Sequence, residues 1–274
     1  MTGMSNLGFH FIYSGLARSG ELRVERRLGD GGPSRKMPAK GADAVFFSIS
    51  YEEDLVPLVR MLKSMEIEPL REDRGNGPLV IAGGPVLSSN PVPFFPIADI
   101  ICAGEGENIL PGVIEAVSAH GRDRPSIAGT LENTDGILMP GIFGKTRLPA
   151  PVDPSNFQHS VIIAEETVFP GTMLIEISRG CPGACAFCMA TSIYRPFRTV
   201  PLGRIMELVE KAAAVSADME EGLKIGLVST AAAAHPQFVE ILDHITGRGG
   251  RVGLSSLRAA DMDEARSAAI GRAG

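Results

Sequence analysis

Three of the four cysteines lie within eight positions, at Cys181, Cys185 and Cys188. They follow the apolar run TMLIEIS at 172–178, which predicts a buried strand, and a proline and a glycine between the first two cysteines favour a loop. Such a loop lets three thiols turn toward one point. Three thiolates can hold three irons of a 4Fe-4S cubane and leave the fourth iron without a protein ligand. The spacing therefore predicts an iron-sulfur centre with one iron open to a chelating substrate.

Two other interpretations of these cysteines stay open. A zinc ion accepts three cysteines and a distant histidine such as His235, although the paired CxxC or HxxxH spacing usual for zinc is absent. A lone histidine at a helix start is more often structural, and we expect that of His235. Three unrelated buried thiols are the other interpretation. Cys102, far upstream, is expected to be a small buried apolar residue, which could serve as a fourth thiol only if two domains close on each other.

The composition is that of an ordinary globular protein. Of 274 residues, 44% are hydrophobic and 21% are charged, and the formal net charge is -6. This charge argues against a broad nucleic-acid surface, because such surfaces concentrate lysine and arginine. No apolar run reaches the roughly 18 to 20 residues of a membrane-spanning helix, and the first residues lack the features of a secretory signal. We expect a cytoplasmic protein without membrane or nucleic-acid partners.

Residues 1–120 alternate apolar runs with amphipathic segments, which predicts an α/β domain with a Rossmann-like, open parallel sheet. Ligands of such sheets bind beyond the carboxyl ends of the strands, an edge that would carry 48–50, 83–85 and 104–107. Helices are expected at 6–18, 52–67 and 104–120, and strands at 21–28, 42–50, 78–84 and 98–104, with 42–50 buried like an inner strand.

Residues 121–170 contain many turn formers and predict an irregular linker with one or two short strands. Residues 171–274 then read as three strand-helix units in a row, the beginning of a barrel-like parallel sheet. Their strands are expected at 172–178, 223–230 and 251–257, and their helices at 202–216, 235–249 and 261–272.

The cysteine spacing after a strand resembles the signature of the radical S-adenosylmethionine (radical SAM) superfamily, whose members have a partial (β/α)6 barrel. Residues 167–198 are similar to a subgroup that joins a cobalamin-binding-type domain to this barrel. Its E-x-S-R-G-C approach is seen from Glu176 to Cys181, and its I-Y-R-P-x-R exit at 193–198. The resemblance implies that the three cysteines hold a 4Fe-4S cluster, that S-adenosylmethionine chelates the open iron, and that the backbone of Phe187 lies against the adenine.

The same resemblance implies cofactor contacts at the ends of the next two strands. Ser229 and Thr230 stand where the superfamily often has a Gly-Gly-Glu segment for the methionine amino group, so this sequence departs from the pattern there. Ser255, Ser256 and Arg258 end the third strand, in a segment that is similar to the subgroup. Arg258 is expected either to pair with the methionine carboxylate or to be an exposed arginine of the barrel rim.

Upstream, the resemblance to cobalamin-binding domains is partial. Ser48, with Ile49 and Ser50, and the pair Gly83 and Gly84 match two of their three motifs, and glycine suits a ligand that approaches backbone closely. Residues 3–8 (GMSNLG) stand where the third motif, a histidine loop, would be. Cobalamin therefore either binds without a protein ligand to cobalt or has been lost. Glu107, in the turn 104–107, is expected to favour the dipole of the following helix.

The activity implied is reductive cleavage of S-adenosylmethionine into methionine and a 5'-deoxyadenosyl radical, which abstracts hydrogen from an unknown substrate. A reductant such as flavodoxin or ferredoxin supplies the electron, and cobalamin would permit methyl transfer. Methylthiotransferases resemble this loop too, but they carry three further N-terminal cysteines where this sequence has Cys102 alone. Against the family the chain looks cut at both ends, so we also expect a missing C-terminal half, a partner chain, or a fragment that only binds a cofactor or partner.

Overall fold

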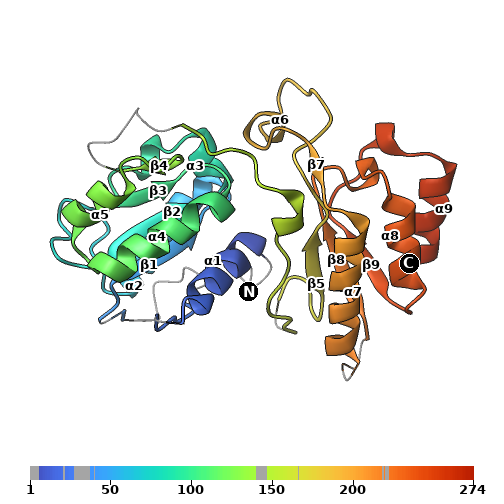
Figure 1. Ribbon diagram of the computed structural model, residues 1–274, viewed down its shortest axis with the longest axis horizontal. Helices are drawn as coiled ribbons and strands as arrows, with labels where there is room; N and C mark the ends of the chain where they lie inside the picture. The colour runs from blue at the N-terminus through green and yellow to red at the C-terminus, as the bar shows by residue number, and fades with distance from the viewer. Residues whose placement is uncertain are drawn as a thin grey trace. The chain divides into compact units, whose positions relative to one another are not determined.

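The structure, a computed structural model, describes residues 6–20, 22–27, 38–39, 41–139, 147–165, 167–217, 219 and 222–274 (Figure 1). The chain divides into two compact units. One unit runs from Phe11 to Ala150, and the other joins Pro151–Gly274 to the N-terminal segment that ends at His10. The division thus falls near residue 150, within the segment 121–170 that is predicted to be a linker. None of the helices in the described ranges is both long and apolar enough to cross a membrane.

The unit 11–150 contains a four-stranded sheet in the order β1-β2-β3-β4. The first three strands are parallel and β4 runs antiparallel to β3, as the alternating pattern predicts for all but the last strand. The strands are β1 (Ala44–Ser48), β2 (Leu79–Gly83), β3 (Ile100–Cys102) and β4 (Ile137–Leu138). The helices are α1 (Leu7–Arg18), which begins in the other unit, α2 (Leu55–Ser64), α3 (Pro85–Ser89), α4 (Gly106–His120) and α5 (Arg124–Leu131).

Alternate residues of β2 face two different apolar layers. Val80 and Ala82 belong to a core that includes residues of α2 and α3, whereas Leu79 and Ile81 belong to a core that includes residues of α4 and α5. Because successive side chains of a strand point to opposite faces, the sheet lies between two helical layers (Figure 1).

Three predictions for this unit need correction. Residues 22–27, expected within a strand, are described and form none. The strand β1 is half-buried along its length, because it forms an edge of the sheet and not an inner position. The expected linker contains β4, one of the short strands predicted there, and also α5, a helix that was not predicted. Asp123 caps α5 by accepting hydrogen bonds from Ser126 at its backbone nitrogen and its hydroxyl, a start signal that the sequence carries in the letters DRPS.

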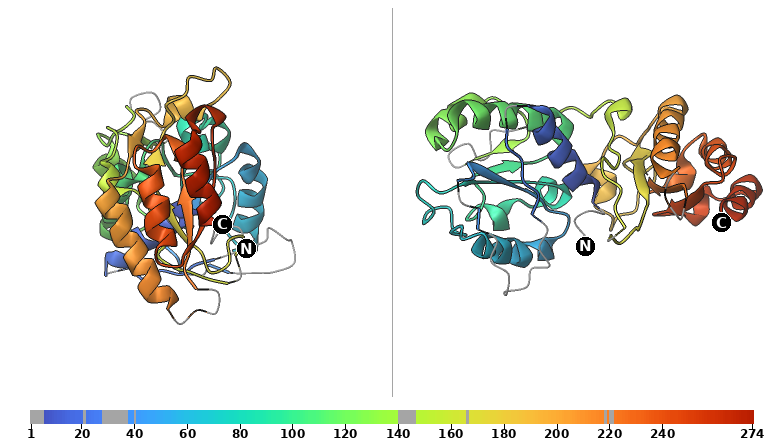
Figure 2. Two further views of the ribbon diagram at one scale, coloured as in Figure 1. Left: turned by 90° about the vertical axis from the view of Figure 1, so that its right-hand side faces the viewer. Right: turned by 90° about the horizontal axis from the view of Figure 1, so that it is seen from below.

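The other unit contains a parallel three-stranded sheet in the order β5-β8-β9. Three helices pack along one face of it in chain order (Figure 2). This alternation confirms the predicted α/β class with three successive strand-helix units. The strands are β5 (Met173–Glu176), β8 (Lys224–Val228) and β9 (Arg251–Leu254), and the helices are α7 (Leu202–Ser216), α8 (Phe238–Thr246) and α9 (Glu264–Ala273).

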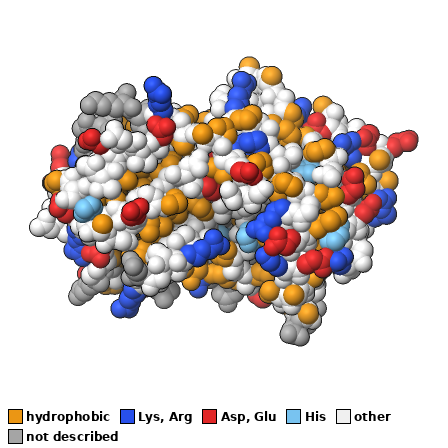
Figure 3. Space-filling model, viewed as in Figure 1, with side chains coloured by type: hydrophobic (Ala, Val, Ile, Leu, Met, Phe, Trp, Pro, Cys, Tyr) orange, Lys and Arg blue, Asp and Glu red, His pale blue; other side chains and the backbone are white. Residues whose placement is uncertain are grey.

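Surface charges of both signs are interspersed over the face in view, as expected from the modest net charge (Figure 3). On α7, for example, Glu207 pairs with Arg204 at 2.8 Å and with Lys211 at 2.7 Å. The two hydrogen bonds lower the pKa of Glu207 to about 2.

Candidate metal centre

The three clustered cysteines occupy a loop between two short strands, β6 (Ser178–Arg179) and β7 (Arg198–Thr199). Cys181 and Cys188 are half-buried, Cys185 is exposed, and all three are free thiols. The backbone nitrogen of Cys188 donates to the carbonyl of Cys185 at 3.0 Å, which fixes a tight turn between them. The loop begins directly after β5 and β6, at the carboxyl end of the first strand of the parallel sheet, as the sequence predicts.

The strands β6 and β7 pair antiparallel and close the neck of this loop. Ser178 lies opposite Thr199, and Arg179 lies opposite Arg198. Gly180 adopts a φ of 83°, and a Cβ atom there would come within 2.5 Å of the carbonyl oxygen of Tyr194. Only glycine tolerates both that backbone conformation and that close approach. The approach and exit motifs of the sequence therefore have a shared structural role, which is to hold the two ends of the loop together.

A two-point ion pair supports the neck. Glu176 accepts hydrogen bonds from Nε and Nη2 of Arg179 at 2.7 and 2.8 Å, and both side chains are largely buried. The guanidinium of Arg179 also stacks over the ring of Phe157, 4.2 Å from its centroid. Paired in this way, the charged residues of the approach motif position the loop, a role that the sequence motif alone did not reveal.

Hydroxyl groups tie together the ends of β6, β8 and β9. The Oγ atoms of Ser178 and Ser229 lie 2.6 Å apart in a buried setting, and Ser229 Oγ also accepts from the backbone nitrogen of Ala231 at 2.9 Å. Ser255 Oγ accepts from the nitrogen of Ser229 at 3.1 Å. Thr230 Oγ1 donates to the carbonyl of Gly180. Of the expected cofactor residues, Ser229 and Thr230 thus already use their hydroxyls within the protein.

Ser256 and Phe187 are accessible, and Arg258 lies beside the cysteine loop. Ser256 is exposed just after β9, and the Phe187 side chain is 92% exposed. Arg258 is half-buried, with its Nη1 atom 3.9 Å from Cys181 Sγ. The structure therefore brings the end of β9 to the loop, as expected for residues that share one edge of a parallel sheet.

Within the residues that the structure describes, no three or more histidine, cysteine, aspartate or glutamate side chains gather closely enough to hold a metal ion. The three cysteines share one loop, and their convergence on a cluster stays a prediction. Residues 184–187 are exposed. The donor set still fits an iron-sulfur cubane, because it consists of three free thiols on one loop with a fixed neck.

His235, the candidate fourth ligand of a zinc site, is fully buried. Its Nε2 atom lies 2.9 Å from the carbonyl of Val200, and its Nδ1 atom accepts from the backbone nitrogen of Gln237 at 3.1 Å. Burial lowers the pKa of His235 below its ordinary value. Both ring nitrogens are used in the fold, so a zinc site completed by His235 is wrong and the structural interpretation of this residue holds.

The candidate cobalamin edge of the unit 11–150 is assembled as predicted. Ser48 is paired with Gly83, and the nitrogen of Ile49 donates to the carbonyl of Gly83 at 2.8 Å. Gly84 has a φ of 129°, and a Cβ atom there would lie 2.1 Å from the carbonyl oxygen of Ile49. The second glycine is therefore required by packing between the two strand ends, and the approach of a ligand to it stays a prediction.

The described part of this edge offers no ligand for cobalt. The only histidine in residues 11–150 is His120, in the last turn of α4, where it lies 3.0 Å from Thr130 Oγ1. Residues 3–5 of the segment expected to replace the histidine loop lie outside the described ranges. Cys102 is buried at the end of β3, and burial raises the pKa of its thiol to about 12, as expected for a small apolar residue. Glu107 lies in the first turn of α4, where its charge favours the helix dipole.

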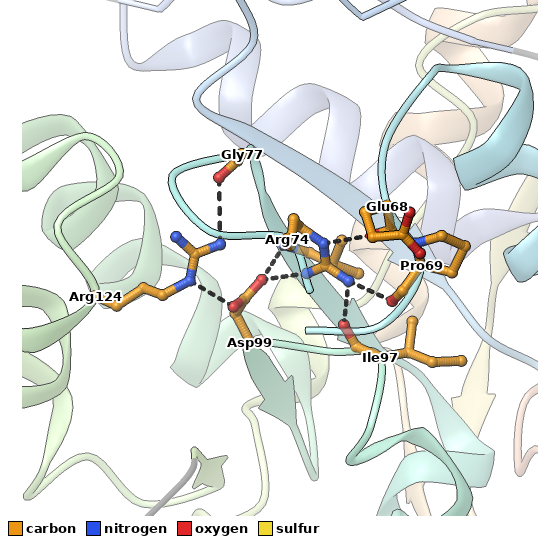
Figure 4. Close-up of polar contacts among 8 residues, drawn as sticks. Glu68, Pro69, Arg74, Gly77, Ile97, Asp99 and Arg124 are labelled. Carbon is orange, nitrogen blue, oxygen red and sulfur yellow. Dashed lines mark hydrogen bonds and ion pairs between the residues drawn. The ribbon is translucent and has the colours of Figure 1, made fainter. Parts of the chain in front are cut away.

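Sequence reasoning missed a buried ion network at the opposite end of the same sheet. Asp99 lies directly before β3 and accepts from Arg74 Nη1 at 2.6 Å, Arg124 Nε at 2.7 Å and the backbone nitrogen of Val80 at 2.8 Å (Figure 4). Because it lies at the amino ends of β2 and β3, this network is structural and not part of the ligand edge.

Comparisons with known proteins find similarity to one family in part of the chain. The family described as "Radical SAM proteins, N-terminal" matches residues 32–140. An uncharacterized protein, MJ0966, of Methanocaldococcus jannaschii is 27% identical over 230 residues, which cover 82% of this chain and 46% of that protein. The cobalamin-dependent radical SAM methyltransferase TokK of Streptomyces tokunonensis is 28% identical over 134 residues, which cover 46% of this chain and 20% of TokK.

A solved structure shares the fold. The apo form of the cobalamin-dependent S-adenosylmethionine radical enzyme OxsB matches with a TM-score of 0.54 and 14% identity, over 84% of this chain and 33% of that one. The chain spans less than half the length of each of these relatives. By its sequence relationships and its α/β architecture together, the chain is similar to radical SAM proteins of the cobalamin type.

Proposed function

We propose that the chain binds a 4Fe-4S cluster through Cys181, Cys185 and Cys188 and takes part in the reductive cleavage of S-adenosylmethionine. The observation that carries this proposal is the set of three free thiols on one loop, whose ends are held by β6 and β7 at the carboxyl edge of a parallel sheet. Ligands of such sheets bind at this edge.

When bound, such a cluster supplies the single electron that cleaves the sulfonium, and a reductant such as flavodoxin or ferredoxin replaces that electron. The chain's own residues bind and orient. Three cysteine sulfurs act as ligands, the backbone at Phe187 offers a surface for the adenine, and Ser256 stands at the rim. The buried serine network keeps the strand ends, and with them this rim, in a fixed arrangement.

Cobalamin-assisted methyl transfer is the second candidate function. It is favoured by TokK and by the 2-(S-pantetheinyl)-carbapenam-3-carboxylate methyltransferase of Streptantibioticus cattleyicolor, 28% identical over 158 residues that cover 54% of this chain and 23% of that protein. Ser48, Gly83 and Gly84 would line the cofactor edge, without a histidine to cobalt. A titration with hydroxocobalamin, followed by visible absorption, tests this. A spectrum unchanged from that of free hydroxocobalamin would remove cobalamin from the proposal.

The cluster is tested by anaerobic reconstitution with iron and sulfide, followed by metal analysis and electron paramagnetic resonance (EPR). We expect about four irons per chain in the wild type and a large loss of iron and signal in Cys185→Ala. Cys102→Ala is the matched control and should keep the cluster, because Cys102 is buried in the core of the other unit. Stoichiometric zinc, or no metal in the wild type, would refute the proposal.

Cleavage is measured as 5'-deoxyadenosine formed from S-adenosylmethionine and dithionite by the reconstituted protein. A chain that holds the cluster but releases no 5'-deoxyadenosine would instead be a cofactor-binding or partner-binding module. Activity that appears only after a further polypeptide is added would support the proposal of a partner chain or of a separate C-terminal half.

A further inference from the structure

Arg258 is a positively charged side chain that lies beside a sulfur of the cysteine loop. It follows β9, and its Nη1 atom lies 3.9 Å from Cys181 Sγ, the long end of the range for a sulfur acceptor. At that distance the interaction is mainly the electrostatic attraction between the positively charged guanidinium and the sulfur, and less a directional hydrogen bond. Cys181 Sγ also accepts from the backbone nitrogen of Gly183 at 3.4 Å. Cys181 is therefore a sulfur with two donors directed at it.

Asp261 holds the arginine in this position. The segment after β9 turns through a short 3-10 helix, Ala259–Asp261, in which the nitrogen of Asp261 donates to the carbonyl of Arg258 at 3.0 Å. This turn brings Asp261 Oδ2 to 3.6 Å from Arg258 Nε, and the aspartate side chain is only 15% exposed. Oδ2 accepts no hydrogen bond from any described residue, so the guanidinium is the charge that compensates it.

Gly183 lies beside the contact between the two side chains. A Cβ atom at position 183 would lie 3.4 Å from Cys181 Sγ and 3.5 Å from both Cζ and Nη1 of Arg258, which are ordinary van der Waals distances. The backbone of the cysteine loop therefore packs against the sulfur and the guanidinium together.

We propose that Arg258 is a positioning residue for the Cys181 sulfur: held by Asp261, it places a positive charge beside one ligand of the proposed cluster and makes that cluster easier to reduce. Hydrogen bonds and charge at ligating sulfurs set the potential of iron-sulfur clusters. A cation stabilises the reduced form more, because that form carries one more negative charge. The inference rests on the proposed function, since it requires that Cys181 ligate a cluster.

A different role, pairing with the methionine carboxylate, would give Arg258 an effect on cofactor affinity instead. The two roles separate in experiment, because the first is present without S-adenosylmethionine and the second is not. The midpoint potential of the reconstituted cluster is therefore measured by an EPR-monitored titration without S-adenosylmethionine. Affinity for S-adenosylmethionine is measured separately by equilibrium dialysis.

We expect Arg258→Gln to shift the ratio of reduced to oxidised cluster about tenfold toward the oxidised form at a fixed potential, equivalent to about 59 mV for one electron. Arg258→Lys, which keeps the charge, should shift it less. Arg251→Gln, at the exposed start of β9, is the matched control and should leave the potential unchanged. Iron content and circular dichroism show which variants fold and carry the cluster.

An unchanged potential in Arg258→Gln would overturn the inference while leaving the cluster proposal intact. An unchanged potential together with a tenfold loss of S-adenosylmethionine affinity would assign Arg258 to the methionine carboxylate. If Arg258→Gln does not fold, Arg258→Met, which removes the same charge, decides the question. A wild-type protein without a cluster would refute the proposed function, and this inference with it.

Discussion

Asp99 Oδ2 lies 2.6 Å from Arg74 Nη1, and both side chains are at most 2% exposed. The other carboxylate oxygen accepts from Arg124, so one buried negative charge joins two arginines (Figure 4). Arg74 additionally donates to the carbonyl oxygens of Glu68, Pro69 and Ile97. The network therefore links the loop before β2 to the start of β3.

Replacing this carboxylate should destabilise the unit 11–150 strongly. Asp99→Asn leaves Arg74 buried without its counter-charge, and breaking a buried pair in this way costs about 3 to 5 kcal/mol. Urea unfolding followed by circular dichroism measures the loss. Asp73→Asn, in the same unit and exposed, is the control and should change stability by less than about 0.5 kcal/mol. Equal effects of the two substitutions would contradict a structural role for the network.

Gly84 should tolerate no side chain. In Gly84→Ala the new methyl group meets the carbonyl of Ile49 in a backbone conformation that alanine rarely adopts, so we expect a loss of more than about 2 kcal/mol in the free energy of unfolding. Gly112→Ala is the control. It lies inside α4 with nothing within 4 Å of its added methyl, and should stabilise by about 0.5 to 1 kcal/mol. A neutral Gly84→Ala would show that the strand ends are looser than described.

Substitutions at Ser229 and Ser256 should distinguish a structural role of a serine from a role in cofactor binding. Ser229→Ala leaves the buried hydroxyl of Ser178 and the nitrogen of Ala231 without their partner, at a cost of about 1 to 3 kcal/mol in stability. Ser256→Ala removes an exposed hydroxyl and should leave stability unchanged. If Ser256 contacts S-adenosylmethionine, the second variant weakens its binding in equilibrium dialysis. The reverse pattern, with stability lost only in Ser256→Ala, would exclude this division of roles.

His235 makes the unit 151–274 sensitive to acid. Burial is the main cause of its lowered pKa, opposed by the hydrogen bond to Val200 and the charge of Glu240. Below the unfolded value of about 6.5 the unfolded chain binds a proton that the folded chain excludes, so stability falls as the pH falls, by up to about 1.4 kcal/mol per pH unit. The loss levels off below the folded pKa, and above about pH 7 this histidine adds no pH dependence.

This prediction is measured by urea unfolding between pH 7.5 and 5, a range chosen about the unperturbed value. In His235→Gln the slope over that range should become flatter. His244→Gln, on the surface beside Glu210, is the control and should keep most of the slope of the wild type. A wild-type stability that is constant down to pH 5 would contradict the predicted effect.

Local sequence patterns predict much of this fold. The apolar spacing of residues 202–216 predicts α7 at the bounds observed, and the three strand-helix units follow from the same kind of signal. The helix α5 was hidden because turn formers surround its capping signal at Asp123. The half-buried state of β1 could not be read from its letters, because an edge strand with one covered face and an inner strand can share the same composition.

The candidate site was predictable in its parts but not in its contacts. The cysteine spacing predicts the loop, and the parallel sheet places Arg258 at the same edge. No pattern in the sequence shows that Arg258 lies beside Cys181, 77 positions earlier. Nor does any pattern show that the hydroxyl of Ser229 is hydrogen-bonded to that of Ser178, 51 positions earlier. Such pairs depend on the order of strands in the sheet, which is settled by packing over the whole unit.

The antiparallel pairing of Ser178 with Thr199 has a consequence for how the cysteines assemble around iron. The two ends of the cysteine loop are paired with each other, so the residues between them form a loop that is closed by a short two-stranded neck. Binding of the three sulfurs to a cubane would then rearrange only this loop, and the strands β5, β8 and β9 would keep their positions. Loading with metal becomes a local ordering event, whose entropic cost is confined to fewer than about twenty residues.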